Sequence, residues 1–126
     1  MYFKKKRQHE ESRFQQQVVA MLRTHGVFCF SVPNGVKLKK TSARIAKSEG
    51  LLAGVADLII LLSGGRVLFV EFKNPNKTGT QSKDQKEFQK TVETLGFNYV
   101  IWDNWIQVQD FINSYNSCKC RDMMPR

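Results

Sequence analysis

The chain has 126 residues, which is enough for one domain with a buried core and too short for two. Hydrophobic residues make up an ordinary 41%, but 20 lysines and arginines stand against 11 aspartates and glutamates. The net charge of +9 predicts a polyanionic partner, most often a nucleic acid. No segment pairs a basic face with bulky apolar residues, which argues against a membrane surface as the partner.

Neither a secretory leader nor a membrane span is predicted. The first residues, MYFKKKRQHEES, are charged, and no apolar segment follows them. The longest apolar stretch is interrupted by Asp57 and closed by Ser63-Gly64-Gly65, so it is too short to cross a bilayer. We therefore expect a cytosolic protein with reduced thiols. Its three cysteines form no CxxC pair and do not predict a structural zinc site.

The first predicted element is a helix with one chemically mixed face. Residues 1–8 are expected to form a loose basic tail before it. The helix runs from about Glu10 to His25, and Gly26 ends it. Residues at spacings of three and four share its buried face: Glu11, Phe14, Gln15, Val18, Val19 and Leu22.

Strands and helices then alternate. Residues 27–32, VFCFSV, are β-branched and aromatic and predict a strand. A lysine-rich loop leads into a short helix that begins at Thr41 or Ser42 and ends before Gly50. This order favours a single α/β domain, 1–126, with a mixed central sheet flanked by helices. The remaining elements are strands 57–62 and 66–73, helix 82–95, strand 97–102, helix 104–115 and a loose tail, 116–126.

Three charged residues stand at the open end of the most hydrophobic stretch, GVADLIILLSGGRVLFVEFK, which predicts a hairpin. If residues 63–65 form a three-residue loop, Asp57 lies opposite Glu71, with Cβ atoms roughly 4.5–5.5 Å apart. Lys73 lies two residues further along and shares their face. A two-residue loop places Asp57 opposite Phe72 instead, and the glycines of the turn permit either register.

Two carboxylates at that separation repel each other unless a cation lies between them. Mg²⁺ suits such a pair, since it typically takes one or two carboxylates and keeps waters for phosphate oxygens. Lys73 can orient or activate a nucleophilic water. The pattern thus indicates metal-assisted hydrolysis of phosphodiesters. The alternative is structural: E-x-K is often a solvated strand edge, and an aspartate before a strand is often a turn residue.

The wider pattern favours the first interpretation. The runs PNG…AKSEGLLAGVAD, VEFK, GTQSKDQKEF and LGFNYVIW occur in this order between about Glu11 and Trp102. Together they resemble the VRR-NUC family, a branch of the PD-(D/E)xK nuclease superfamily. The resemblance implies a restriction-endonuclease-like core. One departure is Ala56, which stands where the motif has a proline; that proline stiffens the chain and supplies no ligand.

The resemblance also implies an active site that depends on Mg²⁺ or Mn²⁺. Asp57 and Glu71 correspond to the metal ligands, and a backbone carbonyl at Phe72 would assist them. Lys73 is the motif lysine, which would position the attacking water or stabilise charge on phosphorus.

Two further residues correspond to the family pattern. An acidic residue of the first helix completes the site; Glu11 is preferred and Glu10 is the alternative, although a carboxylate there also complements the helix dipole. Gln85 corresponds to a glutamine that opens a later helix. It equally fits a capping box with Ser82, which would direct its side chain to the backbone.

The densest basic run beyond the N-terminus is the candidate DNA contact, although a solvated surface is the alternative interpretation. Such residues would bind phosphate and confer affinity without sequence specificity. They are Lys37, Lys39, Lys40, Arg44 and Lys47.

The expected substrate is branched DNA. Small stand-alone VRR-NUC proteins of phages and bacteria look like homodimeric enzymes that act on four-way (Holliday) junctions, in the host cytoplasm where a phage encodes them. One site per chain predicts a C₂ dimer, since both strands of a junction must be cut. The alternative from another class is a non-catalytic nucleic-acid-binding module with the same fold, which would need no carboxylate pair.

Overall fold

The computed structural model describes residues 2–33, 40–74 and 80–122, with the side chains of 10–33, 42–74 and 80–118. Helices and strands alternate along most of this chain, as predicted. The elements are α1 (Tyr2–Thr24), β1 (Phe28–Ser31), α2 (Lys40–Ser48), β2 (Leu58–Leu62), the 3₁₀ turn η1 (Ser63–Gly65), β3 (Arg66–Phe72), α3 (Lys83–Thr94), β4 (Asn98–Trp102) and α4 (Trp105–Asp122).

The described strands form one mixed sheet in the order β1-β2-β3-β4. β2 is antiparallel to both β1 and β3. The tight turn η1 joins β2 to β3, and so short a connection can join only antiparallel neighbours, whereas α2 lies in the longer connection between β1 and β2. β3 and β4 are parallel, and α3 makes the crossover between them. The predicted α/β class with a mixed, helix-flanked sheet is therefore confirmed.

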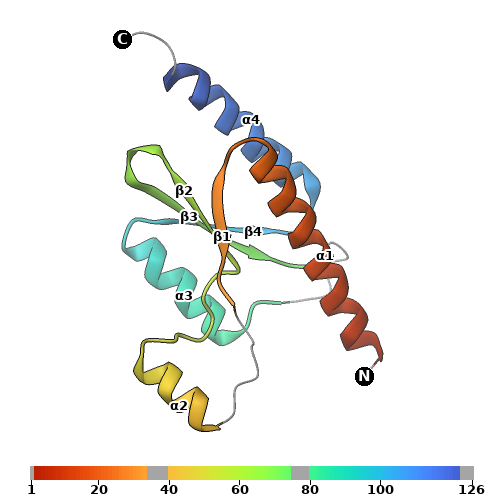
Figure 1. Ribbon diagram of the computed structural model, residues 1–126, viewed down its shortest axis with the longest axis vertical. Coiled ribbons are helices and arrows are strands. Elements are labelled where there is room, and N and C mark those ends of the chain that lie inside the picture. Colours follow the sequence, from red (N-terminus) through yellow and green to blue (C-terminus); the bar gives the residue numbers. More distant parts are fainter. Residues whose placement is uncertain (1, 34–39, 75–79, 123–126) are drawn as a thin grey trace.

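The two faces of the sheet pack against different helices (Figure 1). Successive residues of a strand point to opposite faces, so each strand contributes to both layers. α1 and α4 cover one face and α3 lies against the other. The larger layer is a dry core in which Phe14, Val18, Leu22, Val108 and Ile112 pack against Leu58, Ile60, Val70, Phe72 and Trp102.

The hairpin adopts the three-residue loop. Leu62 pairs with Arg66, and Gly64 and Gly65 have φ angles of 76° and 74°, which glycine adopts without steric cost. The pairing continues to Leu58 and Val70 at the other end. One step beyond that pair, residue 57 lies opposite residue 71, which confirms the first of the two predicted registers.

The terminal helices are longer than predicted. α1 begins at Tyr2 and not near Glu10, and α4 continues to Asp122, so helix extends into both segments that were expected to be loose tails. The lysine, arginine and glutamine residues before Glu10 are good helix formers, and no glycine or proline interrupts residues 116–122. None of the described helices is long and apolar enough to span a membrane.

Exposed apolar side chains gather on the β1–β2 part of the second face. Phe28 and Phe30 have exposed fractions of 65% and 41%, and their ring centroids are 6.3 Å apart. Leu61, which pairs with Phe28, is also exposed. This patch is defined by Phe28, Phe30 and Leu61, and we refer to it as the β1–β2 patch.

Candidate active site

Glu71 is the unusual residue of β3. Its neighbours Val70 and Phe72 enter the dry core, so alternation turns the Glu71 side chain toward the face that carries α3. Only 1% of Glu71 is exposed. Its Oε1 accepts a hydrogen bond from Gln85 Nε2 at 2.6 Å, but its buried Oε2 has no hydrogen-bond partner among the described residues. A buried carboxylate oxygen without a partner is costly, which indicates that something else binds it.

Asp57 lies directly before β2 and extends the ladder by one pair. Its Oδ2 accepts the backbone N–H of Phe72 at 2.9 Å, and its carbonyl accepts the N–H of Val32 at 3.0 Å. The N–H and C=O of one strand residue point to the same edge, so the Phe72 carbonyl also faces the β2 side. The Asp57 side chain and the Phe72 carbonyl are thus brought to one end of the sheet, beside Glu71.

Gln85 connects this carboxylate to the amine of Lys73. The amide Nε2 donates to Glu71, while Oε1 accepts from Lys73 Nζ at 3.1 Å. Oε1 also accepts from the Ser82 N–H at 2.9 Å, and Ser82 Oγ accepts from the Gln85 N–H at 3.2 Å. Both interpretations of Gln85 therefore hold: it closes the capping box of α3 and reaches the site with the same side chain.

Of the two glutamates on α1, Glu11 is the one whose charge acts on the site. Burial and the negative charge of Asp57 raise the pKa of Glu11, and the charge of Lys73 opposes them. Glu10 instead accepts a hydrogen bond from Asn74 Nδ2 at 3.2 Å. The preferred helix carboxylate thus lies near the pair, and the alternative is held by a different side chain.

The carboxylates are electrostatically coupled. Burial, followed by the charge of Asp57, raises the pKa of Glu71 to about 8. The nearby Asp57 carboxyl and the charge of Glu11 raise it further, and Lys73 opposes them. Two ionised carboxylates can only accept hydrogen bonds, so Asp57 in its ionised form cannot satisfy Oε2 of Glu71. The pair therefore holds a proton or a cation near neutral pH.

The donor set fits a hard dication bound by few protein ligands. Asp57 and Glu71 offer carboxylate oxygens, and the Phe72 carbonyl is turned to the same side, which suits Mg²⁺ or Mn²⁺ with waters in the remaining positions. No group of three or more His, Cys, Asp and Glu side chains in the described chain is placed to hold a metal ion together. Glu11 is close enough to the pair to act on it by charge, and its role as a further metal ligand stays a prediction.

The fold that carries this site also occurs in solved structures of other proteins. No family model and no curated protein matches the chain. A solved structure titled "VRR_NUC domain" matches with a TM-score of 0.60 and 20% identity, over 84% of this chain and 97% of that one. A second, titled "VRR_NUC domain protein", matches with a TM-score of 0.63 and 22% identity, over 84% of this chain and 87% of the other. The chain has the VRR_NUC domain fold.

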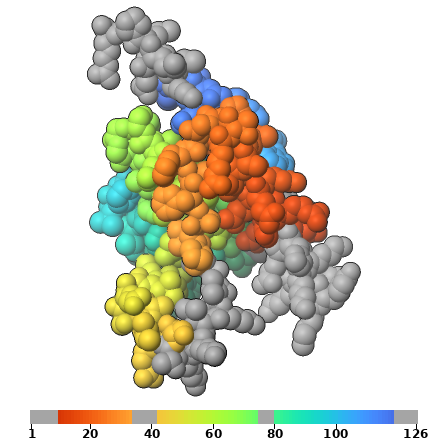
Figure 2. Space-filling view, in the orientation of Figure 1, coloured from red at the N-terminus to blue at the C-terminus, as the bar shows by residue number. Residues whose placement is uncertain are grey.

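The predicted basic residues lie apart from this centre. Lys37 and Lys39 are outside the described residues, as is the side chain of Lys40. Arg44 and Lys47 are exposed on α2. This helix lies apart from the sheet (Figure 1) and forms the yellow to gold part of the space-filling view (Figure 2). They are available to a large ligand but are not part of the carboxylate cluster.

Two features of the site were not predicted. Tyr99 on β4 is buried, and burial followed by the charge of Glu71 raises its pKa to about 12, which keeps its hydroxyl neutral. That hydroxyl accepts from Gln81 Nε2 at 3.3 Å. The second feature is the close approach of Gly54 to the start of α3. No local pattern could reveal either feature, because the partners lie far apart in the sequence.

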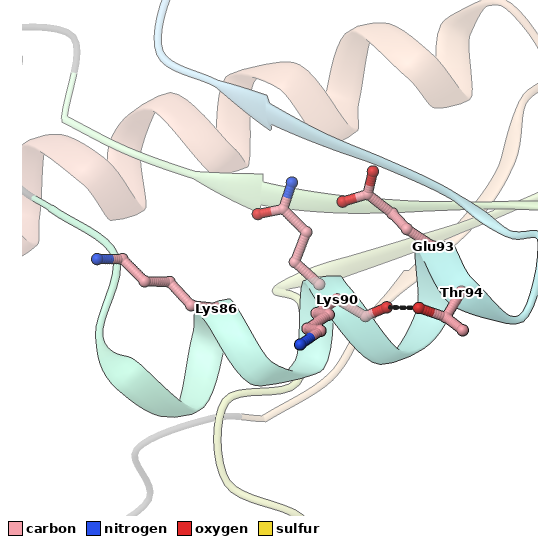
Figure 3. Close-up of a pocket in the computed structure, with 5 residues that line it drawn as sticks. Lys86, Lys90, Glu93 and Thr94 are labelled. Carbon is pink, nitrogen blue, oxygen red and sulfur yellow. Dashed lines mark hydrogen bonds between the residues drawn. The ribbon is translucent and has the colours of Figure 1, made fainter.

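The outer surface of α3 carries a separate hollow (Figure 3). Its volume is about 460 Å³, and it is lined by Lys86, Gln89, Lys90, Glu93 and Thr94. None of these residues binds Glu71 or Lys73 in the described contacts. The carboxylate pair therefore lies outside this hollow, at the end of the sheet.

Proposed function

We propose that this protein is a VRR-NUC nuclease that hydrolyses DNA phosphodiesters with a divalent metal. The observation that carries the proposal is the buried Oε2 of Glu71, which no described residue satisfies and which lies next to a second carboxylate and a lysine amine. A purely structural glutamate would have its oxygens satisfied by protein donors. The VRR_NUC fold supports the same conclusion, since "NUC" in the titles of the similar structures denotes a nuclease.

Asp57 and Glu71, with the Phe72 carbonyl, would hold the metal. When bound there, the ion supplies Lewis-acid activation of a phosphate oxygen and lowers the pKa of a coordinated water. Asp57 is oriented for this role because the Phe72 N–H fixes its other oxygen. Glu71 is oriented by Gln85, which occupies Oε1 and leaves Oε2 for the ion.

Lys73 would act on the attacking water and on the phosphorus oxygens. Its Nζ is held by Gln85 Oε1 at 3.1 Å, so the amine is fixed relative to Glu71 by a single bridging amide. A fixed positive charge stabilises the negative charge that develops on the phosphoryl group and requires no rearrangement at that moment. Glu11 would bind a metal-coordinated water or accept a proton, because its charge reaches the pair.

The net charge of +9 makes DNA the expected polymer. Arg44 and Lys47, which are exposed on α2, would bind its backbone together with Lys37, Lys39 and Lys40 of the same basic run. Contacts of this type bind phosphates, so selectivity for branched DNA would depend on shape.

Junction cleavage by a homodimer is the more specific form of the proposal. One site per chain cuts one strand, so symmetric cleavage of a four-way junction requires two copies. The β1–β2 patch offers exposed apolar surface that a second copy could bury. Sedimentation should then give a dimer, and replacing Phe28 and Phe30 by serine should shift it to a monomer. A monomer that still cuts both strands symmetrically contradicts this form.

One assay tests the activity and its nearest alternative. Synthetic four-way junction, flap, duplex and single-stranded DNA are incubated with the protein in Mg²⁺, Mn²⁺ or EDTA. We expect cleavage that requires the metal, is strongest on the junction, and is lost in Asp57→Asn and Glu71→Gln while DNA binding remains. DNA that is bound but uncut under all conditions identifies a binding module and contradicts the nuclease.

A further inference from the structure

Gly54 packs directly against the backbone of α3. Its φ is 83°, and a Cβ added to it would lie 2.4 Å from the Asp84 carbonyl carbon and 2.7 Å from the Gln85 nitrogen. Ordinary contact begins at 3.4 Å, so the shorter separation would have to open by 3.4 − 2.4, or about 1 Å. The obstacle is backbone and not the end of a flexible side chain. The GVAD segment and the first turn of α3 therefore fit together only when residue 54 has no side chain.

That turn of α3 carries the site glutamine. Gln85 is bonded twice to Ser82, through its backbone N–H and its side-chain Oε1. The same Oε1 and the Nε2 serve Lys73 and Glu71. Each polar atom of the Gln85 amide thus has a defined partner, and its orientation follows from the position of the α3 backbone.

The segment that contains Gly54 also carries the second carboxylate, Asp57. Gly54 precedes Asp57 by three residues in one connecting segment, and Asp57 is held only at the end of the sheet by Phe72 and Val32 in the described contacts. A side chain at 54 must therefore displace either the helix that carries Gln85 or the segment that carries Asp57. A 2.6 Å bond between Gln85 and Glu71 does not survive a movement of this size.

We propose that Gly54 is a positioning residue: the first turn of α3, seated on Gly54 and closed by Ser82, aligns Gln85 with Glu71 and Lys73. The inference rests on the proposed nuclease function for its kinetic consequence only. Its structural consequence holds whether or not the chain cuts DNA.

The chain supplies a matched control for Gly54→Ala. Gly64 has a φ of 76° and nothing within 4 Å of an added Cβ, and it lies in the hairpin turn at the other end of β2 and β3. Gly64→Ala thus introduces the same left-handed strain without a clash. Any difference between the two variants reports the contact with α3.

The experiment reads two NMR signals in the metal-free protein. They are the Gln85 side-chain amide, assigned by its loss in Gln85→Leu, and the Phe72 backbone amide bonded to Asp57. Gly54→Ala should move at least one of them, and Gly64→Ala should move neither. With metal and junction DNA, single-turnover cleavage should fall about a hundredfold in Gly54→Ala, as for a misplacement of about 1 Å. Gly64→Ala should stay within about threefold of the unaltered chain.

A second pair of variants decides the matter if Gly54→Ala does not fold. Ser82→Ala removes the oxygen that holds the Gln85 N–H, and Ser82→Thr retains it. We expect Ser82→Ala to shift the Gln85 amide signal and slow cleavage by about tenfold, and Ser82→Thr to restore both. The proposal is overturned if Gly54→Ala folds and neither NMR signal shifts. It is also overturned if the Gln85 amide signal does not shift in Ser82→Ala. If these signals shift as expected but the protein cuts no DNA, only the proposed nuclease function is overturned.

Discussion

Glu71 and Phe72 are neighbours on β3, yet the two faces of the sheet give them opposite surroundings. Phe72 lies among apolar side chains of α1 and α4, with Phe14 in edge-to-face contact at 5.8 Å. Glu71 lies among Gln85, Asp57 and Lys73, with one oxygen that no described residue satisfies. The surroundings of Phe72 therefore stabilise the fold, while those of Glu71, at the end of the face whose apolar cluster packs on α3, cost folding free energy until a cation or proton binds. Substitutions on the two faces should consequently have opposite effects on stability and activity.

The largest effect is expected on cleavage activity, when Glu71 is replaced. Glu71→Gln keeps an oxygen for Gln85 but loses the negative charge, so we expect cleavage to fall at least about 10⁴-fold, or more than ~5 kcal/mol in barrier. Single-turnover cleavage of a junction with saturating Mg²⁺ measures it. Gln16→Glu, at an exposed position of α1, is a control that changes a charge elsewhere. Activity within tenfold of the unaltered chain would contradict the role of Glu71.

The second-largest effect is expected on the free energy of unfolding, when Phe72 in the apolar core is replaced. Phe72→Ala removes a fully buried ring and leaves a cavity, so the free energy of unfolding should fall by about 3–5 kcal/mol. Urea denaturation followed by tryptophan fluorescence measures it. Glu71→Gln, one residue away, should not destabilise the metal-free protein at pH 8. If it destabilises the chain as much as Phe72→Ala does, the contrast between the faces is wrong.

A smaller effect concerns pH and follows from the raised pKa of Glu71. The folded chain binds this proton more tightly, with a pKa of about 8 against an ordinary 4.5. The stabilisation is complete below pH 4.5 and is lost as the pH rises through 8. In EDTA, the thermal midpoint should fall by at least about 5 °C between pH 5 and 8.5. Glu71→Gln should abolish that fall, and Mg²⁺ should raise the midpoint more at pH 8.5 than at pH 5. An identical slope in Glu71→Gln would assign the dependence to other groups.

The smallest effect is expected for α2, far from both faces. Replacing Arg44 and Lys47 by alanine should weaken DNA binding and flatten the dependence of log K on log salt by about 0.9 for each phosphate that is no longer neutralised. Fluorescence anisotropy over a range of salt concentrations gives the slope. Lys86→Ala with Lys90→Ala, on the outer surface of α3, removes the same charge and serves as the control. If the two double variants have the same slope, α2 has no special role in binding.

Local sequence predicted the part of the site that local geometry controls. The Ser63-Gly64-Gly65 turn and the strand period reduced the hairpin to two registers, one of which places Asp57 opposite Glu71, and S-x-x-Q was sufficient to place Gln85 at the start of α3. Both features depend on contacts over a few residues or across one hairpin.

The remainder depends on tertiary packing. The bond from Gln85 to Glu71, the approach of Gly54 to α3 and the polar partner of Tyr99 join separate elements. Helix lengths were also misjudged, because charge in a terminal segment was interpreted as disorder although its residues favour helix. Glu11 was assigned to the side of its helix that faces the pair, as its charge interaction with Asp57 shows, but spacing alone could not show how closely it approaches.

The most direct test of the account is anomalous scattering from a crystal soaked in Mn²⁺. We predict one strong peak at the end of the sheet, within bonding distance of Glu71 Oε2, an Asp57 oxygen and the Phe72 carbonyl. Soaked crystals of Glu71→Gln should lack it. A map with no peak there at millimolar Mn²⁺, and with Oε2 bonded only to a protonated Asp57, would contradict the metal-dependent chemistry.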